Sequence, residues 1–283
     1  MREVATRALL TGRCRHPEIM TIRGGSLRPA DFPAVATLIV HPEEGSILFD
    51  TGYDPAFIAA TASFPERLYR WTTPMTMEPG RDAASQCRAA GYPPEDVRHL
   101  VLSHFHADHI AGTHAFPNAA IHCARAGLET AQRGGRFAAT RRGMLRALIP
   151  ADFTKRVRFF EDCPAVALPR DCEPFECGAD LLGDGSLLAV ELPGHCPGHW
   201  GLLLNDSRWG THFLVADAAW SLAAIRRDAP PPALTTALLG DTRQTRETLH
   251  RLHVLYCRNT EIRLTPCHCA ERAAEIRCSD RDG

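Results

Sequence analysis

Apolar residues in this chain are grouped in short runs, and most of these runs predict β-strands. The runs at 35–40 and 46–49 are rich in β-branched residues and are separated by the polar segment HPEEG, which predicts a hairpin. The second run leads into Asp50-Thr51-Gly52, a sharp turn after a strand. Asp184-Gly185 lies between apolar runs in 181–192 and predicts a second hairpin turn. Further short strands are expected at 99–103, 119–123, 201–204, 213–216 and 261–264.

Helical patterns alternate with these strands. Residues 81–91 predict a helix closed by Gly91, 124–148 predict an Arg-rich helical region, and 233–256 predict one long helix. Strands followed by a helix occur once in each half of the chain. This order indicates an α/β layered fold with sheets inside and helices outside.

In residues 53–80 the apolar positions follow neither the two-residue period of a strand nor the 3.6-residue period of a helix. This segment contains four prolines and several aromatic residues, and we expect it to be irregular. Two interpretations stay open: a lid over a pocket, or a loop whose aromatic side chains fill the core. The whole chain, 1–283, is expected to form one domain with this segment as its lid.

Composition narrows the class of protein. Of the 283 residues, 45% are hydrophobic and 23% charged, and the net charge is −1, as in an ordinary soluble globular protein. No basic patch dominates, so we expect neither nucleic acid nor an anionic membrane as partner. The 11 cysteines have no repeating spacing and are expected to be mostly free thiols. Without a signal-peptide pattern or an apolar run of about 18 residues, a cytoplasmic location is expected.

The densest chemical signal is the segment Ser-His-Phe-His-Ala-Asp-His at 103–109. His104 and His106 are two apart, so on an extended segment both point the same way and can reach one ion. Asp108 and His109 then begin a turn or helix and can face a second position. Imidazole and carboxylate suit Zn²⁺, and also Mn²⁺ or Fe²⁺. A lone histidine is more often a core or surface residue, but four potential ligands this close together indicate a metal site.

Three more candidate ligands follow predicted strands. His195 lies in Pro-Gly-His-Cys-Pro-Gly-His, Asp217 follows the run FLVA, and His268 follows residues 263–267. Sites in α/β sheets usually lie at the carboxyl ends of strands. Taken singly, each residue could equally be a capping aspartate or a buried histidine.

The string His104-x-His106-x-Asp108-His109 resembles the signature of the metallo-β-lactamase superfamily. Asp50, His195, Asp217 and His268 occur in the same order as that family's other motifs, over about residues 8–270. Within the superfamily the chain is most similar to the N-acyl homoserine lactone lactonases. The similar segments are Thr11-Gly12-Arg13-Cys14, ILFDTG, SHFHADHIAG, PGHCPGH and the 22-residue gap from His195 to Asp217.

The resemblance implies a four-layer αβ/βα sandwich with two divalent metal ions at the edge between the sheets. Zinc is expected, with manganese, iron or cobalt as alternatives. The first ion would be held by His104, His106 and His195, the second by Asp108, His109 and His268, with Asp217 bridging them. Asp50 would orient a ligand by hydrogen bonding, and His199 would support the site or cap its turn. A homodimer is common among similar proteins.

The resemblance also implies a reaction. Two metals lower the pKa of a bridging water, and the resulting hydroxide would attack an ester carbonyl. Asp108 would pass a proton to the departing oxygen. The expected substrate is a small lactone or ester, above all an N-acyl homoserine lactone, which implies quorum quenching. The alternative is another small lactone, ester, thioester or phosphodiester.

The chain departs from the lactonases at two positions near the site. Trp220 stands three residues after Asp217, where these lactonases usually have a Tyr that helps to hold the lactone carbonyl. An indole donates through its N–H but cannot act as an acid or acceptor, so the substrate contact is expected to change. Cys269 stands where an acidic residue often follows the last histidine. We expect Cys196, Cys267 and Cys269 to have a packing role.

Other functions of the fold fit less well. A nuclease would need a basic groove, a β-lactamase would normally be exported, and a di-iron flavoprotein would need a flavodoxin-like partner domain. A protein that only binds ligands would be expected to have lost metal-ligating residues, and all seven are present here.

Overall fold

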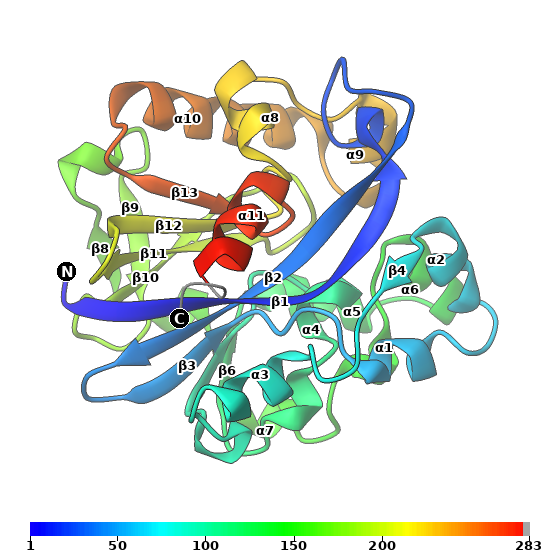
Figure 1. Ribbon diagram of the computed structural model, residues 1–283, viewed down its shortest axis with the longest axis horizontal. Coiled ribbons are helices and arrows are strands. Elements are labelled where there is room, and N and C mark those ends of the chain that lie inside the picture. Colours follow the sequence, from blue (N-terminus) through cyan, green and yellow to red (C-terminus); the bar gives the residue numbers. More distant parts are fainter. Residues whose placement is uncertain (280–283) are drawn as a thin grey trace.

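In the computed structural model, which describes residues 1–279, two β-sheets pack face to face with helices on both outer sides (Figure 1). The first sheet contains β1 (Glu3–Pro17), β2 (Pro29–His41), β3 (Gly45–Phe49), β4 (Met75–Thr76), β5 (His99–Val101), β6 (Ala120–Cys123) and β7 (Val157–Phe159). The second contains β8 (Ala165–Ala167), β9 (Cys177–Asp180), β10 (Leu187–Glu191), β11 (Trp200–Asp206), β12 (Gly210–Ala216) and β13 (Arg263–Pro266).

Strand β1 joins the two sheets. Its first residues, Glu3 and Val4, pair in parallel with the end of β11, and the rest of the strand pairs antiparallel with β2. Strands β3, β5, β6 and β7 run parallel to one another, as do β12 and β13, while β10, β11 and β12 form an antiparallel set. The two sheets therefore share one long strand, which fixes their position relative to each other.

Helices cover the outer faces of both sheets. In the first half they are α1 (Pro55–Ala60), α2 (Arg67–Thr72), α3 (Ala83–Ala89), α4 (Ala107–Ile110), α5 (Arg125–Gln132), α6 (Arg136–Arg141) and α7 (Phe153–Arg156). In the second half they are α8 (Leu222–Arg227), α9 (Ala233–Leu239), α10 (Thr242–Arg258) and α11 (Ala270–Ser279). Short 3-10 turns occur at 18–20, 94–96, 113–115, 146–148, 160–162 and 170–172.

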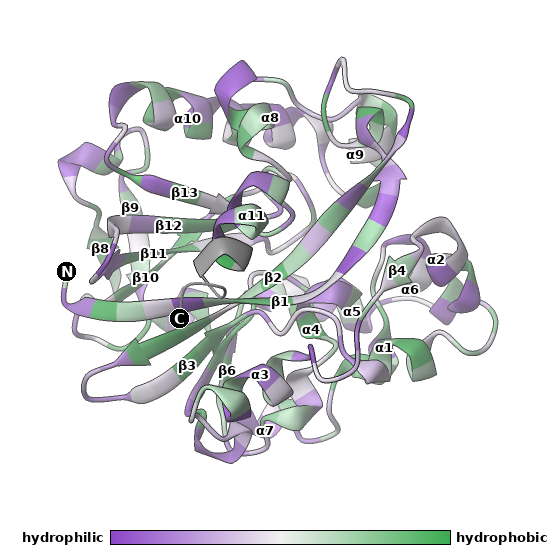
Figure 2. Cartoon of the chain, in the orientation of Figure 1, coloured by the Kyte–Doolittle hydropathy of each residue, from purple (hydrophilic) through white to green (hydrophobic). Residues whose placement is uncertain are grey.

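The core consists of apolar layers that follow from the strand period. Ile47 and Phe49 of β3 point between the sheets toward Leu202 and Leu214, while Leu48 points to the helices on the outer side. Because both faces of this strand are covered, its last three residues are all apolar and buried; Figure 2 shows the hydropathy along each element. Helix α10 instead buries one face of mixed apolar and threonine side chains against the second sheet. These layers confirm the predicted α/β fold with sheets inside and helices outside.

Most predicted strands are confirmed, including the hairpin of β2 and β3 and the short strands β5, β6, β11 and β12. The last strand, β13, begins two residues later than expected. In the second hairpin the first strand is β9, so Asp184-Gly185 lies in the connecting loop and 181–186 contain no strand. The long strand β1 is not predicted from its pattern, because its polar residues, among them Arg7 and Arg13, interrupt the apolar run.

The prediction that 53–80 is irregular holds for only part of the segment, which also contains α1, α2 and β4. Proline is tolerated in the first turn of a helix, and Pro55 starts α1 while Asp54 caps it by accepting from the N–H of Ala56 at 2.8 Å. Of the two interpretations of this segment, a loop that fills the core fits some of its aromatic residues and an exposed lid fits others. Phe57 is fully buried, whereas Phe64 and Trp71 are each 66% exposed.

The two longer helical predictions are also corrected. Residues 124–148 contain α5, α6 and a 3-10 turn, with a break at Gly134-Gly135. The single helix expected over 233–256 is divided into α9 and α10 at Gly240-Asp241. A side chain on Gly240 would lie 2.0 Å from the carbonyl oxygen of Gly194, and the N–H of Asp241 donates to that oxygen at 2.8 Å. The helix therefore ends where the chain must pack against the turn that carries His195.

Buried His212 of β12 makes the stability depend on pH. Burial, together with nearby Arg263, lowers the pKa of His212 from 6.5 to about 3, and its Nε2 lies 2.8 Å from the Thr265 hydroxyl. Below pH 6.5 the unfolded chain binds a proton that the folded chain excludes, so this contribution to stability is present above pH 6.5 and is lost as the pH falls toward 3. We expect His212→Gln to lose about 2 kcal/mol less of its unfolding free energy than the parent between pH 7 and pH 5. Urea denaturation in the presence of a chelator measures this, and equal losses in both proteins would contradict it.

Candidate metal centre

The seven candidate ligands all follow strand ends. His104 and His106 follow β5, and Asp108 and His109 lie in the short helix α4. His195 follows β10, Asp217 follows β12 and His268 follows β13. Strands β10, β12 and β13 run in the same direction, so their carboxyl ends meet at one edge of the second sheet. The structure brings all seven side chains together there, and all but His195 are fully buried.

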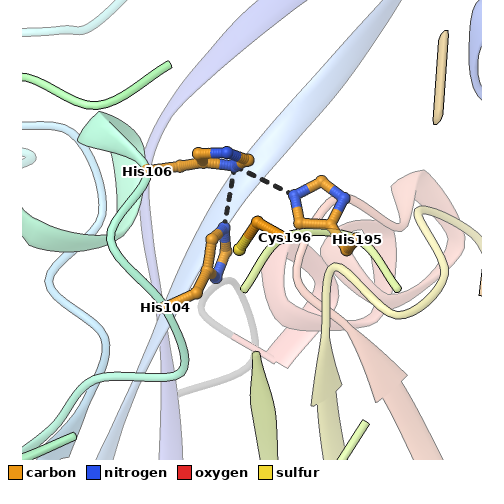
Figure 3. Close-up of side chains that lie close together, drawn as sticks. All are labelled: His104, His106, His195 and Cys196. Carbon is orange, nitrogen blue, oxygen red and sulfur yellow. Dashed lines mark hydrogen bonds between the residues drawn. The ribbon is translucent and has the colours of Figure 1, made fainter. Parts of the chain in front are cut away.

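Three histidines form the first group (Figure 3). The Nε2 atoms of His104 and His195 lie 3.0 and 2.9 Å from Nδ1 of His106. Burial and the neighbouring imidazoles lower the pKa of His104 well below its usual value and that of His106 to about 3. Neutral rings whose nitrogen atoms converge in this way can offer lone pairs to a cation.

A second group lies on the other side of Asp217. The Nε2 atoms of His109 and His268 are buried and have no hydrogen-bond partner. They lie 3.5 and 3.2 Å from Oδ1 of Asp217, and Oδ2 of Asp108 lies 3.3 Å from Nε2 of His268. This group therefore offers two imidazole nitrogens and two carboxylate oxygens.

Asp217 faces both groups. Its Oδ2 lies 3.1 Å from Nε2 of His195 and 3.9 Å from Nε2 of His104, while its Oδ1 faces the second group. The backbone N–H of Asp217 donates to Nε2 of His199 at 3.1 Å, and Nδ1 of His199 donates to the carbonyl of Leu192 at 3.0 Å. His199 thus fixes the backbone that carries the shared carboxylate.

Charge is distributed unequally between the two groups. Burial alone would lower the pKa values of His109 and His268, but nearby acidic groups outweigh it and raise both well above the usual range. The same two rings, against the opposing effect of burial, lower the pKa of Asp108 to about 2 and that of Asp217 well below its usual value. Protons on these imidazoles balance the buried carboxylates, and a divalent cation would replace those protons.

The residues fit divalent metal ions. Each group holds at least three nitrogen or oxygen donors, and the orphaned Nε2 atoms of His109 and His268 lack any other partner. Sulfur atoms are also close: Cys196 lies with the first group and Cys267 with the second, each within 4.8 Å of that group's ligand atoms. The thiol of Cys267 donates to Oδ1 of Asp217 at 2.7 Å.

Hydrogen bonds orient the rings. Asp50 accepts from Nδ1 of His109 at 2.7 Å and from the backbone N–H and hydroxyl of Ser103, both at 2.8 Å. The Ser103 hydroxyl in turn lies 2.9 Å from Nδ1 of His104. Nδ1 of His268 donates to the carbonyl of Pro33 at 2.7 Å. In all three histidines Nδ1 is thereby engaged, and Nε2 is the atom left to bind metal.

Two of these orienting groups were missed at the level of sequence. Ser103 is the first residue of the histidine segment, and its position there was an available signal. The carbonyl of Pro33 belongs to β2, more than 200 residues away from His268, and no pattern indicates it.

Glycines hold the turn at 193–199 between two helices. Gly194 has φ +128°, and a side chain on it would lie 2.2 Å from the backbone nitrogen of Thr245 in α10. Gly198 has φ +72°, and a side chain there would lie 2.4 Å from the nitrogen of Gly127 in α5. Only glycine fits these contacts, so the backbone of the turn packs closely against both helices and the position of His195 is fixed.

Trp220 lies beside the second group. Its ring centroid is 4.5 Å from that of His268 and 5.3 Å from that of Phe32. Cys269 does not support His268 directly: its sulfur accepts from the N–H of Leu222 at 3.5 Å, and the carbonyl of Pro33 takes the supporting position. The indole is thus the aromatic side chain at the rim of the centre.

Comparison with known proteins agrees with this geometry. The model of the Metallo-beta-lactamase superfamily matches residues 30–253, so the chain belongs to this superfamily. It is a metallo-hydrolase of that superfamily, as predicted, and the fold implies that it binds divalent metal.

Its relatives include several lactonases. An N-acyl homoserine lactonase from a Bacillus species is 26% identical over 223 residues, which cover 77% of each chain. The N-acyl homoserine lactonase AttM of Azorhizobium caulinodans is 32% identical over 165 residues, covering 57% of this chain and 56% of the relative. A probable metallo-hydrolase of Mycobacterium tuberculosis is 31% identical over 187 residues, covering 62% and 54%. The chain thus spans little more than half the length of the last two.

Solved structures support the fold. An N-acyl homoserine lactone hydrolase with N-hexanoyl-L-homoserine bound at its catalytic metal centre aligns with a TM-score of 0.72 at 19% identity, over 97% of each chain. Among residues 1–279, no helix is long and apolar enough to cross a membrane.

Asp50→Asn tests the orienting role of this carboxylate. The amide can no longer accept from all three donors, so His109 loses its fixed orientation, and we expect metal affinity to fall about 10- to 100-fold. Competition with a coloured chelator measures the affinity. Asp82→Asn is the matched control, because Asp82 caps α3 and Asn caps equally well. Parent-like affinity in Asp50→Asn would show that Asp50 does not orient His109 for metal binding.

Proposed function

We propose that this protein is a two-metal hydrolase that opens lactone rings, with N-acyl homoserine lactones as the leading substrates. The observation that carries the proposal is the position of Asp217, whose two oxygens face two separate groups of donors. One carboxylate shared in this way suits a pair of ions. The lactonase names of several relatives support the choice of substrate.

Each position would use residues already oriented for it. His104, His106 and His195 would hold the first ion, Asp108, His109 and His268 the second, and Asp217 both. Zinc suits this set of donors, and manganese, iron or cobalt are alternatives. When bound, the ions supply Lewis acidity and lower the pKa of a coordinated water.

Asp108 is the residue proposed to move a proton. Its pKa of about 2 keeps Oδ2 ionised at neutral pH, and its side chain is 9% exposed at the centre. An ionised, nearly dry carboxylate can accept at Oδ2 a proton from the water that attacks the carbonyl, and deliver it to the ring oxygen as the C–O bond of the lactone breaks. Nε2 of His268, a proposed ligand of the same ion, lies 3.3 Å from that oxygen.

Trp220 is proposed to position the substrate. Its contacts with His268 and Phe32 hold the ring at the rim of the centre, and the indole N–H can donate to a carbonyl oxygen. This donor would take the part that a tyrosine hydroxyl plays in the similar lactonases.

Metal content and ring opening test the proposal together. We expect about two metals per chain, measured by elemental analysis, and proton release from acyl homoserine lactones that exceeds release from a thioester or phosphodiester control. His106→Ala removes a ligand and should lower kcat/KM at least about a hundredfold. His114→Ala is the control, because that side chain is 53% exposed and lies outside both groups. Two metals without lactone turnover would discard the substrate class, and a chain that holds no metal would discard the mechanism.

Substitution of Trp220 separates its two possible roles. Trp220→Phe keeps an aromatic ring against His268 but removes the N–H donor, and we expect kcat/KM to fall roughly tenfold with metal content unchanged. Trp220→Tyr restores a donor and should recover part of the loss. If the Phe variant matches the parent, the indole only packs against His268.

A further inference from the structure

A cavity of about 490 Å³ lies next to the turn that carries His195. Its wall includes Gly194, Cys196 and Pro197 of that turn, the end of α5, the end of α6 and the junction of α9 and α10. The volume is within the range of small-molecule sites.

One residue of the cavity wall, Cys196, also lies against the proposed first metal position. The sulfur of Cys196 lies within 4.8 Å of the ligand atoms of His104, His106 and His195. Arg142, which also lines the cavity, precedes Gly143. The carbonyl of Gly143 accepts from the N–H of Ala107 at 3.0 Å. A side chain on Gly143 would lie 3.2 Å from the His106 ring. The wall of the cavity therefore includes Gly194 and Cys196, the residues on either side of His195, and this turn links the cavity to the proposed metal centre.

Three arginines face this cavity: Arg133, Arg141 and Arg142. Arg141 and Arg142 form no ion pair or side-chain hydrogen bond with any residue of the described chain. Arg133 has only a distant partner, Glu129 at 3.9 Å, and both of those side chains are exposed. The cavity thus presents guanidinium groups whose donors are free.

Neighbouring arginines of the same segment behave differently. Arg136 forms an ion pair with Glu66 at 2.6 Å, and Arg146 donates to the carbonyl oxygens of Ala131 and Gln132. Within this Arg-rich segment, the side chains away from the cavity are engaged in the fold, whereas Arg141 and Arg142 at the cavity are not.

The rest of the wall adds little negative charge and an apolar patch. Asp241 is the one acidic side chain on the wall, and its Oδ1 is already used to accept from the N–H of Gln244 as the cap of α10. Leu238 and Leu239 of α9 contribute apolar surface. Guanidinium groups bind carboxylates and phosphates through paired hydrogen bonds, so the wall suits an anionic group next to a short aliphatic segment.

We propose that this cavity binds an anionic end of the substrate, so that the preferred lactone or ester carries a carboxylate or a phosphate on its acyl side. This inference rests on the proposed function and specifies its substrate class. The free arginines would hold the anion, and the leucines would contact the chain that links it to the carbonyl at the metal centre.

Matched substrates test the preference. The first is an acyl homoserine lactone whose six-carbon acyl chain ends in a carboxylate, the second is its methyl ester, and the third carries a terminal phosphate. We expect kcat/KM for an anionic substrate to exceed that for the methyl ester by roughly tenfold, and the gap to shrink at high salt. The first and third substrates distinguish a carboxylate from a phosphate.

Variants assign the preference to the arginines. In the double variant Arg141→Ala/Arg142→Ala we expect the anionic preference, measured as the ratio of kcat/KM for the anionic substrate to kcat/KM for the methyl ester, to disappear. Arg246→Ala is the matched control, because Arg246 is an exposed arginine of α10 that does not line the cavity. A parent enzyme without the preference, or a double variant that retains it, would overturn the inference.

Direct binding keeps this test separate from the proposed function. Calorimetric titration of adipate and of inorganic phosphate into the metal-loaded parent and the double variant should show binding that the double variant loses. If no lactone is turned over but this difference persists, the proposed function fails and the anion site stands. Equal binding by both proteins, or none by the parent, overturns the anion site.

Discussion

Three carboxylates are buried at one point of this structure, and much of the surrounding architecture compensates for their charge. Asp50, Asp108 and Asp217 are all nearly inaccessible to water, and buried charge is costly unless it is compensated. In the protein alone, protons on His109 and His268 provide that compensation. A site that must gather positive charge in this way is suited to divalent cations, because ligand groups release their protons when a metal ion binds.

The surrounding architecture maintains this arrangement by fixing backbone more than side chains. The turn at 193–199 is held between α5 and α10 by glycines that no larger residue could replace. Gly240 ends α9 against the same turn, and Asp241 donates its N–H to the carbonyl of Gly194. Even the break in a helix therefore serves to seat a ligand-bearing loop, which explains why the helical pattern at 233–256 alone was misleading.

The arginine-lined cavity shows that a chain with a net charge near zero can still carry a local concentration of positive charge. The net charge of −1 gives no sign of a basic surface, yet Arg141 and Arg142 line one cavity next to the His195 turn without acidic partners in the described chain. Selectivity for small substrates depends on such local placement, because interactions between exposed charges are screened beyond about 10 Å. The same hydrolytic centre can thus serve substrates that differ in the charge of a remote group.

The layered α/β class, most strands and the seven candidate ligands could be predicted from the amino-acid sequence, because strand period and dense histidine spacing are local properties. The sequence did not determine the helices within 53–80, since prolines that start helices and prolines that break them look alike in a pattern. Only the tertiary structure decided that Asp217 faces two groups, that the Pro33 carbonyl holds His268, and that the arginines meet at a cavity. These relations join residues far apart in the chain, and they arise from packing between layers, which no local pattern records.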